Sequence, residues 1–229
     1  MRSIFAAIIA MFCVAWMPVM ASTPAAEGEL TNAQLIEQVR NKYADVDVLR
    51  ADFVQVVSTP GFGEGEKQRG RVVLKRPKKM RWEFKTPQPK SFITDGEAMW
   101  IWSPQENGGK GQVIIYKNMA AAGSMTDILN DLSKLDEYFA VERVLDDQNG
   151  KRLHVLSATP KDEQANVKTL KIWLTKRQLQ LERVVITDKL GNVTDLSFTQ
   201  VKTNPSNVKN TEFSFTPPSG AEVIESAGM

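Results

Sequence analysis

The sequence holds few residues that could carry out covalent chemistry. It contains one histidine, His154, and one cysteine, Cys13, and it lacks nucleophile-elbow and phosphate-binding glycine motifs. A lone histidine in a strand-like run offers no pair of metal ligands. The carboxylates of Asp127, Asp131 and Glu137 fall on a predicted helix surface, where charge usually meets solvent. We predict no catalytic residues, metal or cofactor, and an exported hydrolase built on these carboxylates is the enzyme alternative.

A second pattern favours binding rather than bond making. Apolar and charged side chains alternate along residues 79–85, so Met80, Trp82 and Phe84 share one face of a predicted strand. Methionine adapts its shape, and tryptophan covers a large apolar area. These three residues are therefore candidates for contact with a hydrocarbon ligand, and ordinary core packing is the alternative for each of them.

The next predicted strand, residues 98–102, carries two pairs of large side chains. Either Met99 and Ile101 or Trp100 and Trp102 face the same side as the first strand. The sequence leaves this choice open, so all four residues are candidates for the binding face.

A helix is predicted after residue 124, with Ser124 or Thr126 as its cap. Its apolar residues recur at helical spacing and are Ile128, Leu129, Leu132 and Leu135. The first three are candidates for a lid over the binding face, again with core packing as the alternative.

Other elements position these residues. Thr31 and Gln34 have the spacing of a capping box and predict a helix that ends near Asp45. From Leu49 onward an apolar-polar period of two and regular turn signals predict about ten or eleven antiparallel strands. This spacing favours an antiparallel sandwich or barrel, and a strongly bent sheet with two or three helices over its apolar side would fit the alternation and could leave a cavity between sheet and helices.

The N-terminus has the pattern of a secretory signal. Arg2 precedes an apolar run at residues 4–12, and small residues suit cleavage after Ala21, with Ala26 as a second site. We expect a signal peptide at residues 1–21 and one domain at residues 22–229, with a membrane anchor as the alternative. Bulky residues before Cys13 argue against its lipidation.

The composition limits the possible partners. The chain has 29 basic and 27 acidic residues, with neither a basic tail nor an acidic block. This balance argues against nucleic acid as a partner. We expect a monomer released into an exported compartment.

Four motifs in order resemble the periplasmic outer-membrane lipoprotein carrier (LolA) family. They are Phe53-x-Gln55, Leu74-Lys75-Arg76-Pro77-x-x-Met80-x-Trp82, Thr94-Asp95-Gly96-x-x-Met99-Trp100-Ile101-Trp102-x-Pro104 and Phe213-x-Phe215-Thr216-Pro217-Pro218-x-Gly220. Their order and spacing cover residues 30–225, nearly all of the predicted mature chain.

The resemblance implies a mainly β, α+β fold, in which a half-open antiparallel barrel is covered by two or three helices that enclose an apolar cavity. It also implies a periplasmic chaperone whose cavity holds lipoprotein acyl chains. Such a carrier would receive lipoproteins from an inner-membrane LolCDE-type ABC transporter and deliver them to an outer-membrane LolB-type receptor. The family arginine that holds the lid closed corresponds to Arg76. Met80 stands where the family often has an aromatic residue, which leaves its role in handover open.

Two other functions share this pattern. A periplasmic module of the same half-barrel could sense lipids or lipoproteins instead of carrying them. The anchored receptor of the pathway would need a lipid-modified cysteine at its mature N-terminus, which this chain lacks. The sequence does not specify the lipids carried, the affinity or the extent of lid opening.

Overall fold

The computed structural model describes residues 30–105, 109–117, 125–144 and 153–226, without the side chains of residues 125–127. The described residues from Thr31 onward belong to one compact unit. None of the helices in these ranges is long and apolar enough to cross a membrane. The predicted signal peptide and its cleavage site lie outside the described residues.

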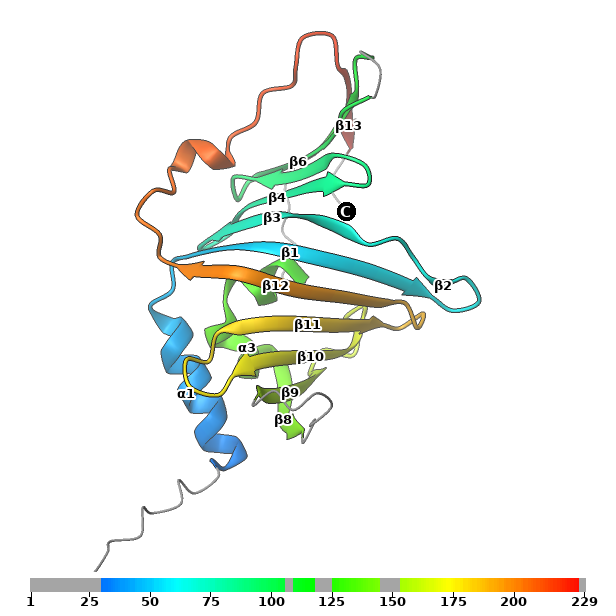
Figure 1. Ribbon diagram of the computed structural model, residues 1–229. Helices are drawn as coiled ribbons and strands as arrows, with labels where there is room; N and C mark the ends of the chain where they lie inside the picture. The colour runs from blue at the N-terminus through cyan, green and yellow to red at the C-terminus, as the bar shows by residue number, and fades with distance from the viewer. Residues whose placement is uncertain (1–29, 106–108, 118–124, 145–152, 227–229) are drawn as a thin grey trace, which may run out of the picture. The chain divides into compact units, whose positions relative to one another are not determined.

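A single open sheet of 13 strands dominates the unit (Figure 1). The strands are β1 (Val48–Thr59), β2 (Gly63–Glu64), β3 (Gln68–Lys75), β4 (Lys79–Thr86), β5 (Lys90–Thr94), β6 (Ala98–Ser103), β7 (Gln112–Lys117), β8 (Phe139–Val144), β9 (Leu153–Pro160), β10 (Val167–Thr175), β11 (Leu181–Asp188), β12 (Val193–Thr203) and β13 (Glu222–Ser226). Their order is β13-β7-β6-β5-β4-β3-β1-β12-β11-β10-β9-β8, with β2 paired to β1.

The mainly β, half-open architecture predicted from the sequence is confirmed. The prediction missed two strands, the two-residue β2 and the C-terminal β13. All strand pairs are antiparallel except β13 with β7, which is parallel. A parallel partner so far along the chain leaves no local turn signal, which explains why periodicity did not reveal β13.

The first helix, α1 (Asn32–Ala44), follows the sequence pattern closely. Its N-terminus has the predicted capping box: the Gln34 amide N–H donates to the Thr31 hydroxyl, and the Thr31 amide N–H donates to the Gln34 side chain. Leu35, Val39 and Tyr43 form its buried stripe. Packing of this stripe holds α1 against the rest of the unit.

The predicted second helix is interrupted. Three short elements take its place: α2 (Met125–Asn130), the 3₁₀ turn η2 (Leu132–Lys134) and α3 (Leu135–Tyr138). Asp131 breaks the helix, because its φ of −144° and ψ of 77° are non-helical. Its carboxylate accepts hydrogen bonds from the Ser133 amide and hydroxyl, a capping arrangement that starts η2. Thr126 lies within α2, and Ser124 lies outside the described residues.

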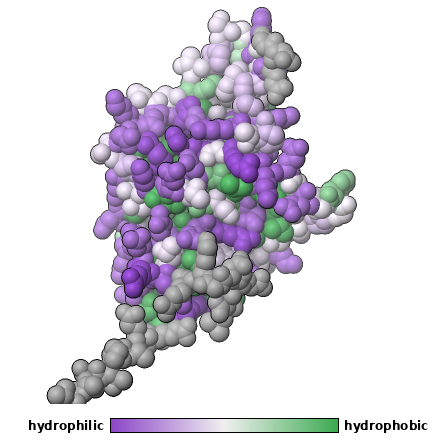
Figure 2. All heavy atoms as spheres, in the orientation of Figure 1, coloured by the Kyte–Doolittle hydropathy of each residue, from purple (hydrophilic) through white to green (hydrophobic). Residues whose placement is uncertain are grey.

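The two faces of the sheet are covered differently. We call the face that carries Met80, Trp82 and Phe84 the inner face. Helices α2 and α3 lie behind the strands in Figure 1, on the inner side, where α2 is next to β3 and α3 next to β8. On the opposite, outer face, hydrophilic residues predominate in the view of Figure 2.

The outer face is partly covered by the C-terminal segment. After β12 the chain forms the 3₁₀ turn η3 (Asn210–Phe213), and the buried Phe213 packs against Val48 and Val73. Arg81 donates a hydrogen bond to the Glu212 carbonyl oxygen at 3.1 Å. These contacts bury an outer-face region of β1, β3 and β4 that alternation alone would assign to solvent.

Candidate functional site

Strand register determines which side chains lie on the inner face. Trp82 of β4 is paired with Val72 of β3 on one side and with Phe92 of β5 on the other. Directly paired residues of antiparallel strands project to the same side of a sheet. The inner face of these strands is therefore continuous and apolar around Trp82.

The same argument resolves the choice on β6. Met99 pairs with Thr94, whose other partner is Met80, and Ile101 pairs with Phe92. Both therefore share the inner face with Met80, Trp82 and Phe84. The structure thus brings Met99 and Ile101 to the candidate binding face.

The two tryptophans of β6 lie on the outer face. Trp100 pairs with Ile93 and Trp102 with Ser91, both of which project outward. The Trp102 ring contacts that of Phe215, with ring centroids 6.2 Å apart. Trp100 and Trp102 therefore lie across the sheet from the other candidates.

An aromatic cluster forms the floor of the inner face. The Phe53 ring lies 5.0 Å from the rings of both Trp82 and Phe84, and Phe84 lies 5.8 Å from Phe92. Gly70 makes this approach possible, since a Cβ there would come within 2.9 Å of the Phe53 ring and 1.8 Å of a backbone oxygen of β4. The floor is densely packed, with Trp82 only 4% exposed.

Away from this floor the inner face becomes more open. Met99 and Ile101 of β6 are half-buried, as are Ile114 of β7 and Phe92 of β5. Ile224 of β13 is aligned with Ile114 and is 41% exposed. The inner face thus grades from a buried aromatic floor to accessible apolar side chains at the β13 edge, an arrangement suited to a hydrocarbon ligand.

The three lid candidates are buried. Ile128 and Leu129 lie on α2 and Leu132 on η2, and each is at most 5% exposed. The helix α2 is next to β3, and η2 packs against α1. These side chains are therefore buried under the elements that carry them. Such burial is expected both for residues of a lid and for residues of an ordinary core.

Arg76 joins two of the covering elements. Its Nη1 donates to the Ala44 carbonyl oxygen at 2.7 Å, and its Nη2 donates to the Tyr43 carbonyl oxygen and to the Asp131 carboxylate, the latter at 2.7 Å. The last carbonyls of a helix lack intrahelical partners, and the guanidinium fork can reach several acceptors at once. Arg76 thus connects the C-terminus of α1 to the junction of α2 and η2.

Sequence reasoning missed the part played by Asp131. We expected its carboxylate on a solvated helix surface, but its side chain is 20% exposed and ion-paired with Arg76. The spacing of Asp131 and Ser133 is a local capping signal that could have revealed the helix break. The pairing with Arg76 spans 55 residues and leaves no local signal. Glu137, by contrast, is exposed as predicted.

Tyr43 anchors the other side of α1. Its hydroxyl donates to the Leu179 carbonyl oxygen at 3.0 Å and accepts from the Leu181 amide at 3.1 Å. Burial raises the pKa of Tyr43 to about 12, with the Leu181 hydrogen bond acting in the opposite direction. The neutral phenol therefore fixes α1 to the turn between β10 and β11.

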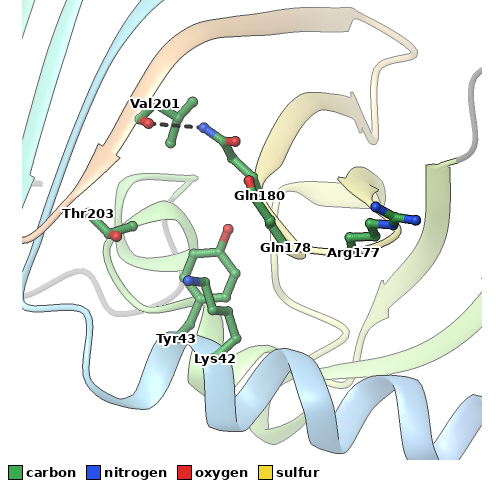
Figure 3. A pocket seen from close by; sticks show the side chains of 7 residues that line it. All are labelled: Lys42, Tyr43, Arg177, Gln178, Gln180, Val201 and Thr203. Carbon is green, nitrogen blue, oxygen red and sulfur yellow. Dashed lines mark hydrogen bonds between the residues drawn. The ribbon is translucent and has the colours of Figure 1, made fainter.

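A hollow of about 470 Å³ opens beside Tyr43 (Figure 3). Its lining consists of Lys42, Tyr43, Arg177, Gln178, Gln180, Val201 and Thr203. Gln180 crosses it, donating from Nε2 to the Val201 carbonyl oxygen at 2.9 Å. Because most of the lining is polar, this hollow is poorly matched to an acyl chain.

The described residues contain no group of three histidine, cysteine, aspartate or glutamate side chains that could hold a metal ion. His154, on β9, is 7% exposed and paired with Leu174 of β10 on the inner face. It is an internal strand residue, as its sequence context predicted.

Comparison with known proteins identifies related chains. Residues 44–216 match the family model described as "Outer membrane lipoprotein carrier protein LolA". The outer-membrane lipoprotein carrier protein of Dechloromonas aromatica is 26% identical in an alignment that covers 95% of each chain. That of Methylobacillus flagellatus is 27% identical, over 82% of this chain and 88% of the relative.

One solved structure shows a similar fold at low sequence identity. An uncharacterized conserved protein from Thermus thermophilus gives a TM-score of 0.50 at 16% identity, covering 85% of this chain and 99% of its own. The comparison with a LolA superfamily protein from Nitrosomonas europaea has a TM-score of 0.43 at 11% identity, and it covers 82% of this chain and 99% of the other chain.

Proposed function

The chain belongs to the LolA family of outer-membrane lipoprotein carrier proteins, and on that premise we propose that it shelters lipoprotein acyl chains on the inner face of its sheet. The observation that supports this site is the continuous apolar surface from the aromatic floor at Trp82 to Ile101 on β6. The proposed cargo is a lipoprotein whose acyl chains lie against this surface while its polypeptide stays in solvent.

A lipid anchor needs such a surface because the free energy of exposing an acyl chain to water is large. Each buried CH₂ group contributes roughly 0.8 kcal/mol, so a single long acyl chain carries about 12 kcal/mol of hydrophobic free energy. Spontaneous passage of a lipid anchor through water is therefore negligibly slow. A carrier has to offer a dry surface of comparable extent, and no bond has to be made or broken.

The proposed route is periplasmic. The carrier would receive lipoproteins from a LolCDE-type inner-membrane transporter and release them to a LolB-type outer-membrane receptor. The names of its relatives and their match over most of both chains support the carrier role, and the transporter and receptor follow from the resemblance to the family. In this proposal Arg76 stabilises the closed state, because its hydrogen bonds join α1 to the junction of α2 and η2.

Transfer from membrane vesicles tests this function. Inner-membrane vesicles that contain a triacylated lipoprotein and the transporter would be incubated with the purified protein and ATP, then sedimented. We expect a soluble one-to-one complex of carrier and lipoprotein in the supernatant. A lipoprotein that stays in the pellet at every carrier concentration would refute the proposed function. An unacylated form of the same lipoprotein, which should not co-elute with the carrier, is the control.

A further inference from the structure

Two polar side chains on the inner side of the sheet are buried without hydrogen-bond partners. Trp82 is 4% exposed, and its indole Nε1 has no acceptor. Asn130 is 8% exposed, and neither its Nδ2 nor its Oδ1 has a partner. Buried polar groups are normally hydrogen-bonded, and those left unpaired destabilise a fold. Each of these groups therefore calls for an explanation.

Neighbouring buried polar groups do have partners. The Thr94 hydroxyl, also on the inner face, accepts from the Gly96 amide at 3.0 Å. Asp131, which directly follows Asn130, is bonded to both Arg76 and Ser133. Poor packing of polar groups is thus not general in this region. The Nε atom of Arg76 is also buried without a partner, but that guanidinium donates through both of its Nη atoms, whereas the indole N–H of Trp82 and the side-chain amide of Asn130 have no hydrogen bond at all.

The positions of the two residues relate them to one ligand site. Trp82 lies on the inner face of β4, among the rings of Phe53 and Phe84, which offer no conventional hydrogen-bond acceptor. Asn130 is the last residue of α2, the helix next to β3, and β3 is the strand that pairs with β4. A ligand between sheet and cover would be bounded by the elements that carry both residues.

We propose that Trp82 and Asn130 form a polar subsite for the carbonyl groups that link acyl chains to a lipid anchor. This inference rests on the proposed function and names the part of the cargo that the site recognises. An acylated cysteine carries ester carbonyls, which only accept hydrogen bonds, and an amide, which both donates and accepts. Trp82 offers one donor, whereas Asn130 offers donors and an acceptor.

Hydrocarbon alone would not account for these groups. Apolar chains give neither atom a partner, and a buried water needs two to four polar neighbours. The floor around Trp82 is formed by phenylalanine rings. A carbonyl oxygen supplies the missing acceptor while its attached chain remains on the apolar face. The subsite would therefore fix the depth at which a chain is held.

Paired ligands with and without carbonyls test this subsite. A fluorescent apolar probe, N-phenyl-1-naphthylamine, would be displaced by a tripalmitoyl cysteinyl peptide or by an analogue with ether and amine links in place of the ester and amide groups. We expect wild-type protein to bind the carbonyl ligand about tenfold or more tightly than the analogue, the factor given by roughly one net hydrogen bond. Equal affinity for the two ligands would overturn the proposal.

Variants assign the preference to the two residues. Trp82→Phe removes the indole N–H while keeping a ring, and Asn130→Leu replaces the amide by a similar apolar volume. Both should lower affinity for the carbonyl ligand more than affinity for the analogue, so that the ratio of the two affinities falls towards one. Trp102→Phe, on the outer face, is the matched control and should keep the wild-type ratio. A wild-type ratio in both test variants would contradict the assignment.

The carbonyls could also come from an ordinary phospholipid. Dipalmitoyl phosphatidylglycerol and its dialkyl ether analogue form the second pair of ligands. An ester preference in this pair as well supports a subsite that reads any glycerolipid, and a preference confined to the peptide supports one that also uses the amide. If none of the four ligands displaces the probe, the proposed function itself fails, which distinguishes that result from loss of the subsite alone.

Discussion

The Arg76 guanidinium lies 2.7 Å from the Asp131 carboxylate, and both side chains are about four-fifths buried. The same guanidinium donates to the last carbonyls of α1. One side chain thus holds the end of the first helix, the start of η2 and the end of β3 together. Because the pair is shielded from solvent, we expect it to contribute more than a surface ion pair does.

Replacement of Arg76 by leucine should loosen the cover. The change leaves the Asp131 carboxylate without its cationic partner, so we expect the free energy of unfolding to fall by about 1–3 kcal/mol. Amide exchange in α2 and η2 should accelerate, and cycling between loaded and empty forms should be impaired. Arg71→Leu is the matched control, because it breaks the exposed pair with Asp52 and should cost less than about 1 kcal/mol. If Arg76→Leu exchanges, loads and unloads at wild-type rates, Arg76 is not a latch.

Asp131→Asn separates charge from capping. The asparagine oxygen can still accept from Ser133, so η2 should keep its cap, whereas the ion pair with Arg76 is lost. We expect a smaller loss of stability than in Arg76→Leu, since the α1 carbonyls keep their donor. Circular dichroism and chemical denaturation measure both properties. A loss equal to that of Arg76→Leu would show that the α1 bonds contribute nothing.

A carboxylate on the inner face should abolish binding. Ile101→Asp introduces a charge on the half-buried apolar surface of β6, where desolvation opposes both the charge and an adjacent acyl chain. We expect at least about a tenfold loss of affinity for an acylated peptide by probe displacement, since one unpaired buried polar group costs more than 1 kcal/mol. Val185→Asp, a half-buried position on the outer face of β11, is the control. Equal losses in the two variants would argue against the inner face as the site.

Stability should fall at high pH because of Tyr43. Its pKa is raised from 10.0 to about 12 in the folded protein, so the unfolded chain releases this proton first. The stabilisation is complete below pH 10 and is lost as the pH rises towards 12, an amount of about 3 kcal/mol. Denaturation measured between pH 9 and 12 should show a steeper decline for wild type than for Tyr43→Phe. Parallel declines would mean that Tyr43 ionises equally in both states.

Removal of the unpaired amide should stabilise the empty protein. Asn130→Leu replaces a buried group without partners by an apolar one of similar volume, so the desolvation penalty disappears. We expect the free energy of unfolding to rise by about 1 kcal/mol and Tm with it, while affinity for the carbonyl ligand falls. A lower Tm would indicate that the amide has a structural partner in solution.

Sequence patterns over a few residues predicted those elements whose formation depends on interactions between residues close in sequence. The Thr31 capping box, the buried stripe of α1 and the shared face of Met80, Trp82 and Phe84 all follow from spacings of a few residues. The two-residue period and the regular turn signals also predicted antiparallel strands, and the resemblance to the LolA family implied the half-open form of the sheet.

Long-range contacts account for what the sequence did not reveal. Alternation along β6 yields two equivalent faces, and the register of β6 against β5 shows that Trp102 lies on the outer one, where its ring contacts that of Phe215. The ion pair of Asp131 with Arg76 joins residues 55 positions apart and leaves no local signal. The unpaired atoms of Trp82 and Asn130 become visible only when the surroundings of both are known.

The decisive measurement is the mass of the protein as isolated gently from its native cell envelope. Native mass spectrometry of wild-type protein, before and after extraction with organic solvent, should reveal a fraction that carries an acylated polypeptide, and Ile101→Asp should lack that fraction. Wild-type protein that never carries an acylated species, even when lipoprotein synthesis is high, would contradict the assignment of the inner face to lipoprotein acyl chains.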